Sequence, residues 1–156
     1  MCRGFREKYL AQAERGQSLV EMTLGFVLIL IVLSGILDLG RAYFIFIALE
    51  DGVGEAALFL SINPHCRTTA DTDLGLGRDC SDPNNAEFRA RNAGGQNVDW
   101  TTVNVVIDRT DPYGVGDPVS VTIDYTFPLL SPFVPRFSGV NPLTLTVKAS
   151  QVIITE

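Results

Sequence analysis

The sequence predicts an α+β fold, in which a long N-terminal helix, partly transmembrane, packs on a small antiparallel β-sheet of about three to four strands with one short extra helix. Two patterns support this prediction: an apolar stretch between residues 22 and 49, and three later runs of alternating apolar and polar residues. The chain has 156 residues, of which 46% are hydrophobic and 19% charged. This size and composition suit one domain with an appended element, and exclude a disordered tail or two large domains.

Charge is distributed unevenly along the chain. The whole chain has 12 basic and 18 acidic residues, a net charge of −6, whereas residues 1–16 contain more basic than acidic side chains. An acidic protein offers no basic face for phosphate groups, so nucleic acid is not an expected partner. Because positively charged flanks tend to stay in the cytoplasm, we expect a single-pass protein of the inner or cytoplasmic membrane. Its N-terminus would lie in the cytoplasm and its acidic C-terminal part outside.

The apolar stretch has the character of a transmembrane helix. No charged residue occurs between Met22 and Leu37, and after two charged residues a second apolar run reaches Leu49. As a helix, residues 22–49 would extend about 42 Å, enough to cross a bilayer. A buried core helix and a cleaved secretory signal are the alternatives, but the stretch is longer than the usual signal core and lacks an A-x-A cleavage site. We therefore expect one retained helix, with its transmembrane part at about 22–49.

A short motif precedes the apolar stretch. Gly16 is followed five residues later by Glu21, and the uncharged run starts at the next residue. This junction, with the basic segment before it, resembles the processing site of type IV prepilins. The resemblance implies that a prepilin peptidase cuts after Gly16, that residues 1–16 are a leader peptide, and that Gln17 becomes the new N-terminus.

Glu21 allows two interpretations. A carboxylate at the edge of the hydrocarbon layer is costly unless it is paired. In a bundle of parallel helices, Glu21 would pair with the new N-terminal amine of a neighbouring subunit and fix the axial stagger between the two. Alternatively, it lies in the membrane interface as an acidic residue near a helix N-terminus, where the helix dipole favours it. Both interpretations remain open on spacing alone.

Further features in residues 16–60 indicate a particular family among proteins with this type of junction. This stretch contains the junction just described, the sequence DLGR at 38–41 and EAA at 55–57. In these features the chain resembles the TadE-like family of tight-adherence pilus assembly proteins, which are minor pilins or pseudopilins. Met22 stands where many major pilins of this system have tyrosine, and those subunits are far shorter. The resemblance therefore implies a minor pilin rather than the major subunit.

The resemblance also implies a function and an organisation. The chain would be a structural pilin-like subunit for assembly of a tight-adherence type IV pilus, working with the prepilin peptidase, other pilin-like subunits and the pilus assembly platform. Its expected parts are the leader at 1–16, a long helix at 17–62 and an extracytoplasmic α+β domain at 63–156. The alternative is a single-pass membrane-anchored binding module that is never processed.

Asp38, Gly40 and Arg41 join Glu21 as candidate residues for helix assembly. Asp38 and Arg41 carry opposite charges three positions apart, so they are neighbours on one helical face. In or near lipid they would neutralise each other or pair across subunits, whereas both are solvated if the membrane ends near Leu37. Gly40 would allow close packing of another helix, or is simply tolerated in a membrane helix. These alternatives remain open.

The segment after the long helix contains a cysteine pair. The sequence Asn63-Pro64 predicts the end of the helix, because proline disfavours a helical residue before it. Cys66 and Cys80 follow in a polar loop outside the membrane, where an oxidising compartment favours a disulfide worth about 3 kcal/mol. Free thiols are an alternative. A metal site is a weaker one, because two cysteines and His65 lack a fourth ligand.

The rest of the chain predicts one short helix and the sheet. Asp82-Pro83 has the pattern of a helix start, with aspartate as the cap and proline first, and Gly94-Gly95 ends the helix. The alternating runs that begin at Val103, Val119 and Leu143 each have one apolar face, typical of strands covered on one side. We expect the upper half of the long helix and the short helix at 83–93 to cover that face.

The connection between the second and third runs, residues 128–142, is long for an idle loop. Three interpretations remain for its apolar residues: contact with the membrane, contact with a neighbouring subunit, or packing over the open end of the sheet. The residues concerned are Leu129, Leu130, Phe133, Val134 and Phe137.

No catalytic pattern occurs in the sequence. It contains no GxSxG, Walker A or HExxH motif, and one histidine. Asp108, Asp111 and Asp117 cluster in a loop rich in glycine and proline, where they would bind calcium weakly or act as ordinary turn residues. We therefore predict a protein that is not an enzyme, with no cofactor, no bound metal and no small-molecule substrate.

Overall fold

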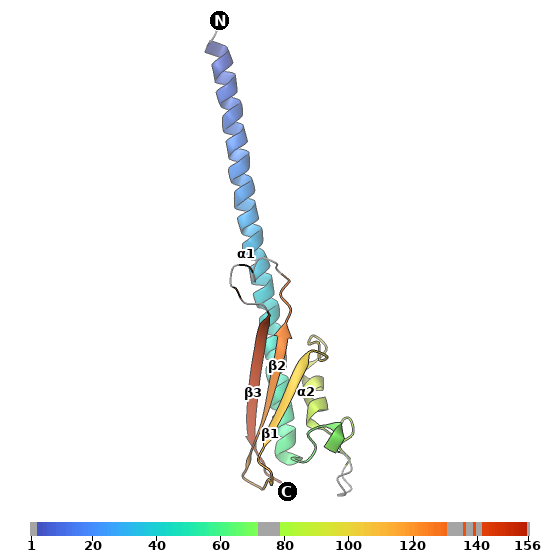
Figure 1. Cartoon of the computed structure of the whole chain (residues 1–156). Coiled ribbons are helices and arrows are strands. Elements are labelled where there is room, and N and C mark those ends of the chain that lie inside the picture. The colour runs from blue at the N-terminus through green and yellow to red at the C-terminus, as the bar shows by residue number, and fades with distance from the viewer. Residues whose placement is uncertain (1–2, 72–78, 131–135, 137–138, 140–141, 156) are drawn as a thin grey trace.

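A single long helix forms the axis of the molecule and carries a small sheet domain on its C-terminal part (Figure 1). In the computed structural model, this helix, α1, spans Arg3–Ile62. It ends directly before Asn63-Pro64, as predicted, but it begins at Arg3 and so also includes most of the predicted leader. The structure describes the backbone alone at residues 3–15, and otherwise residues 16–71, 79–130, 136, 139 and 142–155.

The sheet has three antiparallel strands with the second in the centre: β1 (Val103–Arg109), β2 (Pro118–Phe127) and β3 (Leu143–Val152). Ile123 of β2 lies opposite Val105 of β1 and Val147 of β3. Side chains of paired residues lie on the same face of a sheet, so this register aligns the apolar faces of all three strands. The α+β fold predicted from the alternating runs is confirmed.

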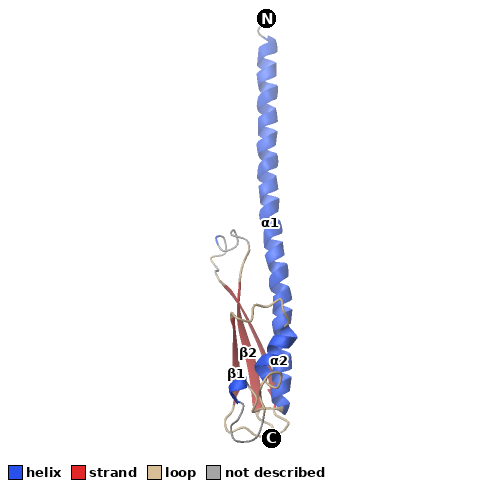
Figure 2. Cartoon of the chain, turned by 90° about the vertical axis from the view of Figure 1, so that its right-hand side faces the viewer, coloured by secondary structure: helices blue, strands red, loops and turns tan. Residues whose placement is uncertain are grey.

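Helix α1 covers the apolar face of the sheet along its C-terminal half (Figure 2). Its buried side chains recur every three or four residues and so form one stripe: Ala42, Ile45, Leu49, Val53, Ala56, Ala57 and Leu60. The same core contains the inward-facing residues of β2, from Val119 to Phe127. The second apolar run of the sequence therefore contributes to the core of the domain. The first apolar run, residues 22–37, lies outside the domain, so the domain covers only the later part of the expected transmembrane segment at 22–49.

The short helix α2 spans Ala86–Gly94, later than the predicted start at Asp82-Pro83. Asn85 is the cap: its Oδ1 accepts a hydrogen bond from the Phe88 amide at 2.8 Å. Asp82 instead accepts a hydrogen bond from Asn85 Nδ2 at 2.7 Å and so orients the capping side chain. The sequence contains two possible caps, and the prediction chose the wrong one. The predicted end was correct, with Gly95 at a φ of 71°.

The predicted place of α2 over the sheet is also wrong, because α2 packs mainly along α1. Two glycines allow this close approach. A Cβ at Gly52 of α1 would lie 2.9 Å from the Ala90 carbonyl oxygen, and a Cβ at Gly94 would overlap the Trp100 ring. The face of β1 that α2 leaves open borders the loop at Arg67 instead.

We predict that Gly94→Ala destabilises the domain by about 1–3 kcal/mol, because the added methyl group forces Trp100 out of its position. Gly54→Ala is the matched control: this helical glycine of α1 has open space around its Cβ position. The control should be neutral or stabilising by about 0.5–1 kcal/mol, since alanine favours the helix. Thermal unfolding of the full chain in detergent measures both. Equal melting temperatures for the two variants would contradict the packing described here.

Candidate membrane helix and its junction with the sheet domain

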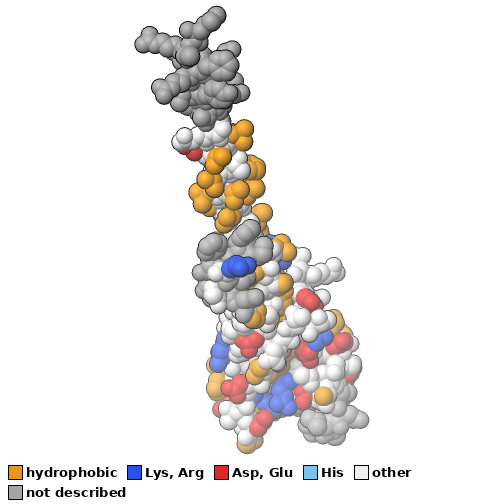
Figure 3. Space-filling view, turned by 45° about the horizontal axis from the view of Figure 1, so that its top comes forward, with side chains coloured by type: hydrophobic (Ala, Val, Ile, Leu, Met, Phe, Trp, Pro, Cys, Tyr) orange, Lys and Arg blue, Asp and Glu red, His pale blue; other side chains and the backbone are white. Residues whose placement is uncertain are grey.

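Between residues 19 and 37, the surface of α1 is apolar and open. Thirteen large hydrophobic side chains in this segment are exposed, from Leu19 to Leu37. In the space-filling view, hydrophobic side chains gather on the visible face of the helix above the sheet domain (Figure 3). Among the described residues, one helix is long and apolar enough to cross a membrane, and none of its most apolar window, with a mean hydropathy of 2.4, is buried. This segment therefore fits a membrane anchor.

Gly16, Gln17 and Glu21, the predicted processing and assembly residues, all lie at the start of this segment. All three are exposed, and the Gln17 side-chain amide donates a hydrogen bond to Glu21 Oε1 at 3.3 Å. A Cβ at Gly16 would have no neighbouring atom within 4 Å. The fold of the monomer thus imposes no packing requirement on Gly16, and the roles of these residues stay predictions.

Asp38 marks the point where the sheet domain begins to cover α1. The residue is 3% exposed, although it lies on a helix surrounded by exposed residues on its N-terminal side. Its Oδ1 accepts a hydrogen bond from the Leu130 amide at 3.1 Å and interacts with Arg41 Nη1 at 3.5 Å. A carboxylate buried with a backbone donor and a guanidinium is paired in the way that burial requires.

Arg41 connects the same region to the end of the central strand. Its guanidinium lies 5.2 Å from the centre of the Phe127 ring, in the geometry of a cation–π contact. Phe127 itself is buried, and Leu130 follows it three residues later. The chain that leaves β2 is therefore held to α1 at two places, the Phe127 ring and the Leu130 amide.

Among the sequence interpretations of Asp38 and Arg41, the one with both residues solvated is wrong for Asp38. The pairing of the two charges was predicted correctly from their spacing. The Leu130 amide was not foreseen, since a contact between a helix and a backbone group 92 positions later leaves no local signal. Gly40, the third candidate, has open space at its Cβ position within this chain, and its predicted role in helix packing is untested.

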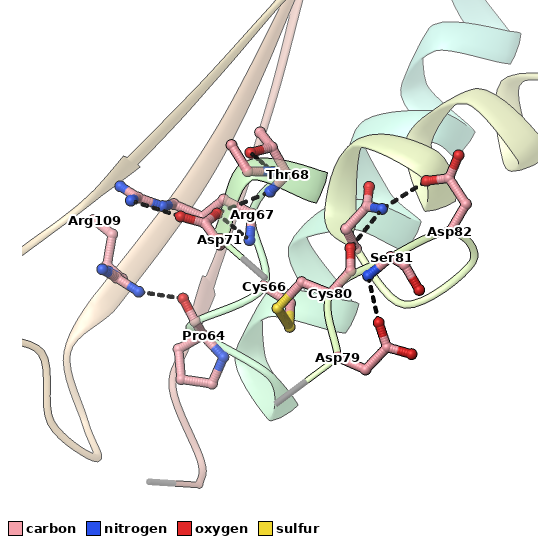
Figure 4. Close-up of a disulfide and its surroundings, with 12 residues drawn as sticks. Pro64, Cys66, Arg67, Thr68, Asp71, Asp79, Cys80, Ser81, Asp82 and Arg109 are labelled. Atoms are coloured by element: carbon pink, nitrogen blue, oxygen red, sulfur yellow. Dashed lines mark hydrogen bonds and ion pairs between the residues drawn. A yellow bond between two sulfur atoms is a disulfide. The ribbon is translucent and has the colours of Figure 1, made fainter. Parts of the chain in front are cut away.

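A disulfide joins Cys66 and Cys80, as the sequence predicts. It lies at the end of the domain furthest from the apolar segment, beside the start of α2 (Figures 1 and 4). The Cys66 carbonyl also accepts a hydrogen bond from the Ala86 amide at 3.0 Å, and the Arg67 carbonyl accepts one from the Glu87 amide at 3.1 Å. The loop after α1 is thus fixed to α2 by one covalent bond and two hydrogen bonds.

Asp71, in the short 3₁₀ helix η1 (Thr69–Asp71), stabilises the same loop (Figure 4). Its carboxylate accepts hydrogen bonds from the Arg67 and Thr68 amides at 3.0 and 2.9 Å and pairs with the Arg67 guanidinium at 3.1 Å. Burial raises the pKa of this carboxyl, but the donors outweigh burial and hold the pKa below its ordinary value of 3.8. The ionised form of Asp71 is therefore the one that the fold favours.

Of the three aspartates predicted in the loop, Asp108 lies in β1, opposite Ser120, whereas Asp111 and Asp117 act as turn residues between β1 and β2. Asp111 pairs with Arg109, and Asp117 Oδ2 accepts a hydrogen bond from the Gly114 amide at 2.8 Å. Within the described part of the chain, no group of three or more histidine, cysteine, aspartate or glutamate side chains is placed to hold a metal ion.

Residues 16–58 match a family model described as TadE-like protein. The match begins at Gly16, continues through the exposed apolar segment and Asp38, and ends in the part of α1 that lies under the sheet. It confirms the predicted resemblance to this family over α1. No curated protein and no solved structure matches the chain.

For the junction, we predict that Asp38→Ala destabilises the protein by about 1–3 kcal/mol, because the Leu130 amide loses a charged acceptor and Arg41 loses its ion pair. Exchange of the Leu130 amide hydrogen should become faster in the same variant. Asp38→Asn keeps an acceptor oxygen and should cost less. Glu21→Ala removes an exposed carboxylate from the same helix and serves as control, with no expected change at Leu130. Hydrogen exchange with mass spectrometry measures these effects, and unchanged exchange at Leu130 in Asp38→Ala would contradict the contact.

The lowered pKa of Asp71 predicts a pH dependence of stability. Its contribution is present above the ordinary pKa near 3.8 and is lost as the pH falls through the lower pKa of the folded state. Asp71→Asn should therefore lower the free energy of unfolding at pH 7, and the difference from the wild type should disappear in strong acid. Denaturant unfolding at several pH values measures this difference. A difference that persists or grows in acid would contradict the prediction.

Proposed function

We propose that this chain is a pilin-like structural subunit, of the TadE type, that is processed after Gly16 and takes part in assembly of a tight-adherence type IV pilus. The observation that carries the proposal is the open apolar half of α1, which starts at the predicted processing site and lies within the matched segment 16–58. A membrane or other apolar helices would cover this surface, since water does not favour so large an apolar area. The activity is one of assembly, without catalysis.

The charges on the two sides of the open segment support one orientation in the membrane. The basic residues before Gly16 would remain in the cytoplasm, and the sheet domain after Asp38 would lie outside. The disulfide in that domain supports this orientation, because disulfides persist in oxidising compartments outside the cytoplasm. The segment from Gly16 to Leu37 would be about 33 Å long, close to the thickness of the hydrocarbon core.

Processing would require α1 to unwind locally. A protease acts on an extended backbone, whereas α1 is helical on both sides of Gly16. Glycine costs about 1 kcal/mol relative to alanine in a helix interior, so it marks a point where opening is easier. Cleavage there would turn Gln17 into the N-terminus, one helical turn from Glu21. The released amine of one subunit would then be available to pair with Glu21 of the next.

The contacts of Asp38 support a role within this chain, in place of the predicted role in helix assembly between subunits. Its carboxylate is directed into the chain's own domain and not toward an open helix face. We infer that Asp38 fixes α1 to the sheet domain, so that force applied to the helix during assembly is transmitted to the domain. Arg41 is half-exposed and remains available to a second subunit.

The second candidate is a membrane-anchored binding module that keeps its leader. One observation favours it: α1 continues without interruption from Arg3 through Gly16, with no break at the predicted cut. The binding-module hypothesis requires the same membrane anchor and the same sheet domain as the pilin-like subunit. The two candidates differ at the N-terminus of the protein in its native membrane.

We predict that the wild-type chain isolated from native membranes begins at Gln17, and that Gly16→Leu begins at Met1. Intact mass and N-terminal sequencing measure the start. Gly25→Leu is the matched control, because it places the same side chain at another glycine of α1 with open surroundings. The control should still begin at Gln17, so that its processing separates a local effect at the cut from a general effect on the helix. A wild-type start at Met1 would contradict processing and favour the binding module.

A further inference from the structure

The apolar surface of α1 does not end where the sheet domain begins. Leu39, Tyr43 and Phe44 follow Asp38 on the parts of the helix that the domain leaves open, with Leu39 and Phe44 each 72% exposed. Leu130, whose amide is bonded to Asp38, has a side chain that is 70% exposed. These four side chains lie around α1 at one end of the domain, and none of them belongs to its core.

The length of the open segment places this end of the domain at a membrane surface. A helix rises about 1.5 Å per residue, so a hydrocarbon core of about 30 Å takes up 20 residues. If the core begins near Leu19, it ends near Leu39. The contact between Asp38 and the Leu130 amide lies at the same level of the helix. With the core in this position, the Leu130 side chain would lie in the layer of lipid headgroups rather than in bulk water.

The charges near this end suit a phospholipid surface. Arg41 is 39% exposed and lies within one turn of Leu39, where lipid phosphate groups would be in reach. Asp38, the acidic residue of α1 nearest to it, is buried and paired. The next acids of α1, Glu50 and Asp51, are exposed and lie about 18 Å further along the helix, beyond the headgroup layer. Tyr43 is amphipathic and of the kind enriched at membrane interfaces.

From these observations we propose that the end of the sheet domain nearest the anchor is a lipid-contact surface, formed by Leu39, Arg41, Tyr43, Phe44 and Leu130. Its partner is the phospholipid headgroup layer of the leaflet that faces the domain, with anionic lipid favoured by Arg41. The inference rests on the membrane anchoring in the proposed function and adds a second contact with the same membrane. A domain held at both α1 and Leu130 is fixed in height and restricted in tilt.

The test uses spin labels on the full chain, reconstituted into vesicles of phosphatidylcholine and phosphatidylglycerol. Single cysteines are placed at Leu130, at Leu28 and at Val106 in a Cys2→Ser background, where Cys66 and Cys80 remain bonded to each other. Leu28→Cys reports on the anchor, and Val106→Cys reports on the outer face of β1, which should stay in water. Collision rates with oxygen and with a water-soluble nickel complex give the depth of each label.

We expect the Leu28 label to be deep in lipid, the Val106 label to be fully aqueous, and the Leu130 label to be severalfold less accessible to nickel than the Val106 label. Replacing phosphatidylglycerol by phosphatidylcholine alone should raise the nickel accessibility at Leu130.

A deep Leu28 label with an aqueous Leu130 label would overturn the lipid contact and leave the anchor intact. An aqueous Leu28 label would overturn both. Shielding of Leu130 from oxygen and nickel together, with spin–spin broadening between chains, would identify a second copy as the partner and also overturn the lipid contact.

Discussion

The architecture depends on the burial of one carboxylate, that of Asp38, against the Leu130 amide and Arg41. This contact divides α1 into two parts with opposite requirements. Before it, apolar side chains point outward in all directions and need an apolar environment. After it, a stripe of buried residues packs under the sheet, while acids such as Glu50 face water. The same helix therefore requires an apolar environment before Asp38 and is compatible with water after it. The boundary lies at the hydrogen-bonded Asp38 carboxylate, and the helix is continuous there.

The continuity of α1 has a mechanical consequence. Because α1 stays helical through Gly40, which lies between its open part and the core, a displacement of the open part is carried to the sheet domain along one continuous helix. At Gly52, the glycine allows α2 to approach closely, and α1 remains helical there. At the far end, the Cys66–Cys80 bond and the hydrogen bonds around it hold the loop after α1 in place. A domain fixed at both ends of its axial helix suits a subunit that is moved as a unit.

Local patterns in the sequence predicted the parts of this structure that local chemistry decides. The alternation of apolar and polar residues predicted the three strands, and the Asn63-Pro64 pair predicted the end of α1. Two cysteines in a loop expected outside the membrane predicted the disulfide. The start of α2 was missed because Asp82 and Asn85 are both good caps, and the choice depends on a network around Cys80. The partner of Asp38 was missed because it is a backbone amide far along the chain. Contacts of that kind depend on the path of the whole fold.

The claim that most needs a direct test is participation in pilus assembly. The measurement is the amount of tight-adherence pili on cells with the chromosomal copy of this chain deleted, together with the subunit composition of pili purified from the wild type. The account predicts that piliation falls in the deletion strain and returns when the wild-type chain is supplied. Normal piliation in the deletion strain, with wild-type pili that lack the chain, would contradict it.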